Sequence, residues 1–203
     1  MTFPSFSQVE TKQDLFVAEH FGHKTGGFFV DVGAYDGKHL SNTHQLEKVL
    51  GWKGICIEPL PHAYAGLLVH RQCVCVQAAA FSQAGLELEF ASSDVLSGLV
   101  EHIDRWTEVL KEPRFKVRTT TVTAELDKAG APSHVDYLSI DTEGSELEVL
   151  KGIDWSRYSF GFISLEHNFM EPRRSEMRAF LAERGYRYLR ENCFDDDYVR
   201  NAP

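Results

Sequence analysis

Short apolar runs alternate with segments of helical periodicity along most of the chain. The runs at 27–33, 53–59 and 73–79 have the length and composition of buried strands. Apolar residues at helical spacing follow the first and second of these runs. Strands that alternate with helices form a parallel sheet, which helices cover on both faces. This part of the chain therefore predicts an open α/β sheet.

The same alternation returns in the second half of the chain. Apolar runs at 135–141 and 160–167 predict two more parallel strands. Pro172 suits the first turn of the helix expected after them, because its missing N–H has no partner there. Segments 186–192 and 197–200 then predict a hairpin at the C-terminal end of the sheet.

The middle of the chain has a different pattern. Segments 86–90 and 115–122 alternate apolar and polar residues, which predicts a pair of half-exposed strands. The polar loop at 92–98 fits either a surface loop or a loop that covers a binding site. Because no linker or internal repeat interrupts the pattern, we expect a single domain over residues 1–203.

The N-terminal segment, residues 1–25, is expected to be helical and to pack on the core. Its apolar positions at helical spacing are Val9, Leu15, Phe16 and Phe21. If this helix also covers a binding site as a lid, Gln13 would be its polar contact.

Charge and hydropathy exclude several classes of protein. Thirty acidic and 21 basic residues give a net charge of −9, which argues against nucleic-acid binding through phosphates. No segment approaches the roughly 18 apolar residues of a membrane span. The first residues also lack the pattern of a secretory signal, so we expect a cytoplasmic protein. The four cysteines have no metal-ligand spacing and are expected to be buried thiols of a reducing compartment; they are Cys56, Cys73, Cys75 and Cys193.

The expected binding site lies beyond the carboxyl ends of the strands, where open α/β sheets bind ligands. The first strand ends in a turn that contains Asp31, Gly33 and Gly37, and small residues let the backbone approach a ligand closely. The second strand ends in Glu58, a carboxylate placed to accept both hydroxyls of a ribose. The pair predicts a nucleoside-binding site.

The identity of that nucleoside follows from charge. The glycine spacing that seats a pyrophosphate is absent, and Asp36 stands between Gly33 and Gly37. A carboxylate there would repel a pyrophosphate and attract a cation such as the sulfonium of S-adenosylmethionine. Two alternatives stay open: a nucleotide-dependent oxidoreductase or epimerase on the same fold, and a non-catalytic module that binds S-adenosylmethionine.

Four segments resemble the FkbM family of S-adenosylmethionine-dependent methyltransferases: SQxxxxQDLF at 7–16, FFVDVGAYDG at 28–37, SNTHQLEKVLGWKGICIEP at 41–59 and DYLSIDTEGSELEVLKG at 136–152. The resemblance implies the Rossmann-like class I fold, a doubly wound and mostly parallel sheet of seven strands whose C-terminal strand is antiparallel. It also implies O-methylation, with a small-molecule or glycan acceptor such as a sugar, glycolipid or polyketide hydroxyl.

The resemblance further assigns cofactor contacts. Asn42 would lie near the methionine end, although Ser41-Asn42 also reads as a plain helix cap. Glu58 would hold the ribose, and the alanines around Ala79 would flank the adenine. The full set of expected cofactor-binding residues is Asp31, Gly33, Ala34, Asp36, Gly37, Asn42, Glu58 and Ala79.

A second group of polar residues follows the later strands. Asp141 and Glu143 come after one strand and Glu166-His167 after the next, so both pairs are expected at the cofactor's edge of the sheet. Methyl transfer to oxygen needs alignment of the reactants and a base for the hydroxyl proton. His167, assisted by Asp141 or Glu143, is the expected base; its alternative is a histidine whose hydrogen bonds only close the strand.

The same acids could hold a metal. Asp141, Glu143 and Glu166 offer the oxygen ligands that Mg²⁺ prefers. We favour a metal-free enzyme at this point, because His167 departs from the all-oxygen pattern. The acidic run 195–197 fits an exposed turn better than a contact with the acceptor. A homo-oligomer is compatible with the sequence.

Overall fold

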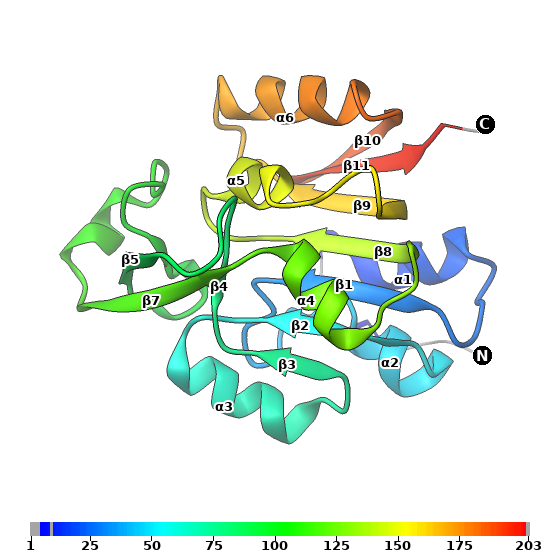
Figure 1. Ribbon diagram of the computed structural model, residues 1–203, viewed down its shortest axis with the longest axis horizontal. Helices are drawn as coiled ribbons and strands as arrows, with labels where there is room; N and C mark the ends of the chain where they lie inside the picture. Colours follow the sequence, from blue (N-terminus) through cyan, green and yellow to red (C-terminus); the bar gives the residue numbers. More distant parts are fainter. Residues whose placement is uncertain (1–4, 9, 202–203) are drawn as a thin grey trace.

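A seven-stranded sheet forms the centre of the computed structural model, which describes residues 5–8 and 10–201. The strands lie in the order β10-β11-β9-β8-β1-β2-β3 (Figure 1). Neighbours run parallel except that β11 is antiparallel to both β9 and β10. The expected mostly parallel sheet with an antiparallel C-terminal strand is confirmed. Its strands are β1 (Phe28–Val32), β2 (Lys53–Ile57), β3 (Val74–Val76), β8 (His134–Ile140), β9 (Ser159–Glu166), β10 (Tyr186–Asn192) and β11 (Asp195–Arg200).

Of the helices in the described part of the chain, three cover each face of the sheet. Helices α1 (Gln13–His20), α2 (His44–Leu50) and α3 (Pro61–His70) pack on one face, and α4 (Val122–Ala129), α5 (Glu146–Lys151) and α6 (Arg173–Ala182) on the other. The two cores follow from the alternation of side chains along each strand. None of the described helices is long and apolar enough to cross a lipid bilayer.

Among the described residues of the N-terminal segment, the helix begins at Gln13, and α1 packs on the sheet. Val17 and Ala18 are buried in the same core as Phe29 and Leu46. Val9, which was expected on this apolar face, lies outside the described residues.

A second sheet, in the order β4-β7-β5-β6, lies beside the central one (Figure 1). Its strands are β4 (Ala79–Ala80), β5 (Glu87–Ala91), β6 (Gly98–Leu99) and β7 (Arg114–Thr120). The strand expected at 73–79 is confirmed at Val74–Val76, but its predicted extent is wrong. The chain leaves the central sheet after Val76, and Ala79 pairs with Thr119 of β7 instead.

The C-terminal hairpin is confirmed, but the acidic run within it is not a turn. Asp195 begins β11 and pairs directly with Glu166 of β9. The turn is made by Cys193 and Phe194 instead, with Cys193 at a φ of 58°. Asp195, Asp196 and Asp197 are consequently buried inside the sheet.

All four cysteines are free thiols, but only Cys56 is buried. The expectation of four buried thiols is wrong because β3 is the edge strand of the sheet. Cys73 and Cys75, which lie beside and in this edge strand, are partly exposed.

Candidate active site

A polar cavity opens at the carboxyl ends of the central parallel strands. The side chains that end these strands line it: Asp31 on β1, Glu58 after β2, Asp141 after β8 and Glu166 on β9. Four of the acids expected at one edge from the sequence therefore do meet there. The topology explains the meeting, because β1 lies between β2 and β8 and β9 follows β8.

Gly33 makes the close approach of two strand ends possible. It has a φ of +81°, and a Cβ at this position would lie 1.7 Å from the backbone oxygen of Asp141. Only glycine fits such a position without a shift of the backbone. The loop after β1 and the loop after β8 can therefore share one wall of the cavity, where Ala34 also lies.

Glu58 is held in place by backbone groups. Its Oε2 accepts the N–H of Tyr35 at 2.9 Å, and its Oε1 accepts the N–H of Leu60 at 2.8 Å. Burial raises the pKa of Glu58 to about 7, against the opposing effect of these two hydrogen bonds. Each carboxylate oxygen has a second lone pair, so the fixed carboxylate can still accept two hydroxyl groups.

A second, less polar cavity adjoins the first. Gly33, Glu58, Ser97 and Asp141 line both cavities. The second cavity is otherwise walled largely by apolar residues, among them Ala79, which is 4% exposed. A polar cavity joined at a carboxylate to an apolar one fits a ligand that has a sugar between a charged end and a flat ring.

Asp36 and Gly37 line neither of these two cavities. Asp36 accepts the backbone N–H groups of Lys38 and His39, both at 2.8 Å, and so shapes the loop. A Cβ on Gly37 would lie 2.6 Å from side-chain atoms of Arg71 and Leu67. Both residues therefore stabilise the conformation of the loop, whereas the sequence had predicted that they contact the cofactor in the cavity.

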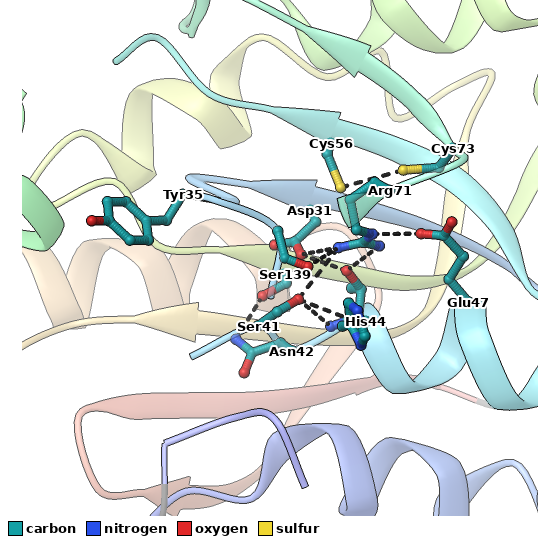
Figure 2. A network of polar contacts seen from close by, with 12 residues as sticks. Asp31, Tyr35, Ser41, Asn42, His44, Glu47, Cys56, Arg71, Cys73 and Ser139 are labelled. Atoms are coloured by element: carbon teal, nitrogen blue, oxygen red, sulfur yellow. Dashed lines mark hydrogen bonds and ion pairs between the residues drawn. The ribbon is translucent and has the colours of Figure 1, made fainter. Parts of the chain in front are cut away.

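Arg71 organises the layer beneath the cavity (Figure 2). Its side chain is fully buried and donates to Glu47 at 2.5 Å and to Thr43 at 2.9 Å. The Thr43 hydroxyl in turn donates to Asp31 at 2.5 Å. Arg71 was not foreseen, because it follows α3 in a segment with no motif and its partners are 24 or more residues away.

Asn42 and Ser41 divide the two roles that the sequence left open. Asn42 lines the polar cavity, and its Nδ2 donates to the Ser139 hydroxyl at 3.1 Å (Figure 2). The Ser41 hydroxyl accepts the N–H of His44 at 3.1 Å, at the start of α2. Ser41 thus supports the start of α2, whose N-cap residue is Thr43, and Asn42 contributes a side chain to the cavity.

The loop after β8 turns two carboxylates toward the cavity. Glu143 has a φ of 53°, and a Cβ on the next residue, Gly144, would lie 2.0 Å from the backbone oxygen of His102. Glu146 fixes this loop by accepting the Gly144 N–H at 2.8 Å. Burial raises the pKa of Asp141 to about 7, and burial together with Asp141 raises that of Glu143 to about 9.

His167 does not reach the cavity. Its side chain is 0% exposed, its Nδ1 accepts the N–H of Phe169 at 2.9 Å, and its Nε2 lies 3.4 Å from Asp196. Its neighbour Glu166 lines the cavity instead. Because successive residues along a strand point to opposite sides, only one of the pair could face the ligand. The expected general base is therefore a buried histidine that closes the strand.

Several cavity residues had no clear signal in the sequence. The hydroxyl of Tyr35 donates to Asp94, so the loop at 94–97 lies over the polar cavity, which its residues line. Of the two alternatives that the sequence left open for the loop at 92–98, a surface loop or a loop that covers a binding site, the structure favours the second. Gln13 of α1 also lines the cavity, and Asp195 does so from β11.

Comparison with solved structures identifies the class of fold. Precorrin-6y C5,15-methyltransferase from Geobacter metallireducens is similar over 98% of this chain and 94% of its own, with a TM-score of 0.54 and 12% identity. The methyltransferase FkbM from Methylobacillus flagellatus is similar over 96% of this chain, with a TM-score of 0.52 and 13% identity. This chain spans 56% of that second protein. The fold is that of the class I methyltransferases.

The family follows from the sequence match. The model of the methyltransferase FkbM domain matches residues 31–188, which include most of the cavity described above. No curated protein has a matching sequence. The chain belongs to the FkbM methyltransferase family, and the resemblance noted in the sequence is confirmed. Membership implies an enzyme that takes its methyl group from S-adenosylmethionine.

Proposed function

We propose that this protein is an S-adenosylmethionine-dependent O-methyltransferase that acts on a hydroxyl of a sugar, glycan, glycolipid or polyketide. One observation carries the proposal: the fixed carboxylate of Glu58 lies where a polar and an apolar cavity meet. A nucleoside with a cationic tail matches this order: its base would lie in the apolar cavity, its ribose at Glu58 and its charged end in the polar cavity.

The cofactor fits the donor set of the cavity. Glu58 would accept the ribose hydroxyls, and the apolar wall that includes Ala79 would contact the adenine. Asp31 and Asn42 would face the methionine end. The bound cofactor supplies a methyl group on a positively charged sulfur, which suits a cavity lined by carboxylates.

The protein's own part in the reaction is alignment and proton transfer. In the proposed displacement the acceptor oxygen forms a bond to the methyl carbon as the carbon–sulfur bond breaks, and the hydroxyl proton leaves. Asp141 and Glu143 are the candidates to take that proton, since both line the polar cavity and their pKa values are raised to about 7 and about 9. A base works best with a pKa near the working pH. We do not propose His167 for this role.

The proposal also includes the class of acceptor, the cellular location, the extent of the domain and the oligomeric state. The net charge of −9 favours a small-molecule or glycan acceptor over nucleic acid. The free cysteines support the expected cytoplasmic location. We also propose a single domain over residues 1–203 that forms a homo-oligomer. The loop at 94–97 is a candidate for acceptor recognition.

Titration calorimetry with S-adenosylhomocysteine tests the first step. We expect binding by the wild type, at least tenfold weaker binding by Glu58→Ala, and no change in Glu87→Ala, whose exposed side chain lines neither of the two cavities. No binding at millimolar ligand overturns the proposal. Binding of NAD in place of S-adenosylhomocysteine would indicate the oxidoreductase or epimerase.

A transfer assay tests the second step. Radiolabelled S-adenosylmethionine is supplied with glycan, lipid and polyketide extracts, and the products are separated by class. We expect label in an alkali-stable methyl ether. Cofactor binding without any transfer would indicate the non-catalytic module.

A further inference from the structure

Three carboxylates at the edge of the polar cavity lie close enough to share one ion. Asp141, Glu143 and Glu166 each offer an oxygen, and these three oxygens all lie within 4.8 Å of one another. Two oxygens bound to the same ion at roughly 2.1–2.4 Å are at most about 4.2–4.8 Å apart. The three acids come from two neighbouring strand ends, so the sheet itself holds them together.

Two buried acids here form no ion pair with a basic side chain of the described residues, and Glu166 shares a hydrogen bond with Asp141, another acid. Glu166 is 7% exposed, and its Oε2 has no hydrogen-bond partner among the described residues. Asp195, also 7% exposed, lies opposite Glu166 in the sheet and lines the same cavity. Among the described residues no hydrogen bond or ion pair reaches the Asp195 carboxylate. An isolated buried carboxylate is costly, which points to a missing positive partner.

The rest of the chain shows that such isolation is unusual. Every other buried carboxylate in the described part of the chain accepts a hydrogen bond or pairs with a base. They are Asp14, Asp31, Glu47, Glu58, Glu125, Asp136, Glu146, Asp196 and Asp197.

A second acidic group provides a comparison within the molecule. His167, Glu191 and Asp196 also lie within reach of one ion. There, however, Arg174 and Arg178 donate to Asp196 at 2.8 and 2.7 Å. Protein cations already neutralise that group. No arginine, lysine or histidine of the described chain forms an ion pair with the three acids at the cavity.

We infer that Asp141, Glu143 and Glu166 bind one hard divalent cation of the Mg²⁺ class, with Asp195 adding negative charge beside it. Carboxylate oxygens are the ligands that such ions prefer. This differs from the metal-free enzyme favoured on the sequence alone, where His167 was expected at this edge as the general base; it lies outside the cavity instead.

The use of the ion in catalysis rests on the proposed function. A cation at this position can hold an acceptor hydroxyl by its oxygen and lower the pKa of that hydroxyl. With the ion bound, Asp141 and Glu143 serve as its ligands instead of taking the proton themselves, and Asp195, another carboxylate that lines the cavity, would take it.

Binding of Mn²⁺ as a paramagnetic probe tests the site without any assay of activity. Protein saturated with S-adenosylhomocysteine is titrated with Mn²⁺, and free ion is measured by electron paramagnetic resonance. We expect about one Mn²⁺ per chain, displaced by Mg²⁺. Glu166→Gln and Glu143→Gln should bind at least tenfold more weakly, and Glu87→Gln, which removes the same charge elsewhere, should bind like the wild type.

Thermal unfolding provides the control for folding. Mg²⁺ should raise the melting temperature of the wild type and of Glu87→Gln but not that of Glu166→Gln. The inference is wrong if the wild type binds no Mn²⁺ at millimolar concentration, or if both cavity variants bind it as tightly as the wild type. S-adenosylhomocysteine binding in the same samples separates that outcome from a failure of the proposed function.

Discussion

Glu58 combines a rigid position with a raised pKa. Two backbone N–H groups orient its carboxylate, while burial and the nearby Asp141 and Asp31 oppose its ionisation. The carboxyl group is therefore close to half protonated near neutral pH, with a pKa of about 7. A ligand that donates hydroxyl groups and carries a positive charge favours the ionised form.

The affinity for S-adenosylmethionine should accordingly rise with pH. Below pH 7 Glu58 must lose a proton before it can accept the ribose hydroxyls fully, so binding costs extra free energy there. We expect an affinity gain of roughly three- to tenfold between pH 6 and pH 8, measured by calorimetry. Glu58→Gln should bind more weakly and with a shallower pH dependence. An unchanged slope in this variant would contradict the assignment.

At the scale of elements, the loop between β1 and α2 is held by a side chain from another part of the chain. Arg71, which follows α3, bonds to the backbone oxygen of Gly37 and to Ser41 and Thr43 in the loop. It also pairs with Glu47 on α2. One residue thus fixes the loop, α2 and α3 relative to each other (Figure 2).

Removal of Arg71 should cost far more stability than removal of an exposed arginine. Arg71→Met removes the buried guanidinium that pairs with Glu47 and leaves that carboxylate only Lys48 and the Gln72 N–H, which costs about 3–5 kcal/mol. Arg157 provides the matched control, since its pair with Asp127 is also 2.5 Å long but exposed, and Arg157→Met should cost far less stability than Arg71→Met. Urea unfolding measures both free energies. Equal losses in the two variants would refute the structural role of Arg71.

At the scale of the whole molecule, the negative charge is concentrated where the ligands are expected. Glu58, Asp141, Glu143 and Glu166 all lie at the carboxyl edge of the central sheet and have raised pKa values. Buried like charges make this edge costly in the free protein. Cationic ligands should therefore stabilise the fold as well as bind to it.

The free protein should lose stability as the pH rises above neutral. Asp141 and Glu143 have pKa values of about 7 and about 9 in the fold but ordinary values when unfolded, so the folded state binds more protons across this range. In the presence of a chelator, calorimetry should show a melting temperature lower by roughly 3–6 °C at pH 9 than at pH 6.5. Glu143→Gln should reduce the drop; a melting temperature that stays constant would contradict the raised pKa values.

Much of the fold can be predicted from local patterns. The runs around Phe28–Val32, Lys53–Ile57 and His134–Ile140 are strands because their apolar residues lie next to each other in the chain. Helix α4 was missed, since its apolar positions directly follow a strand and only Thr121, whose hydroxyl accepts the Ala124 N–H at 3.1 Å, marks its start. In α3 the neighbouring leucines differ, because Leu67 is buried in the core and Leu68 is 60% exposed.

The sequence by itself determined the parallel sheet, the glycine turn at Gly33 and the carboxylates Glu58 and Asp141 at strand ends. Each depends on neighbouring residues, whose periodicity and turn chemistry can be recognised locally.

Only the tertiary structure decided which side chains face the ligand. It placed Glu166 in the cavity and His167 outside it, and brought Asp195 beside them through the insertion of β11 between β9 and β10. These outcomes depend on strand order and on contacts between distant segments, which no local pattern of residues records.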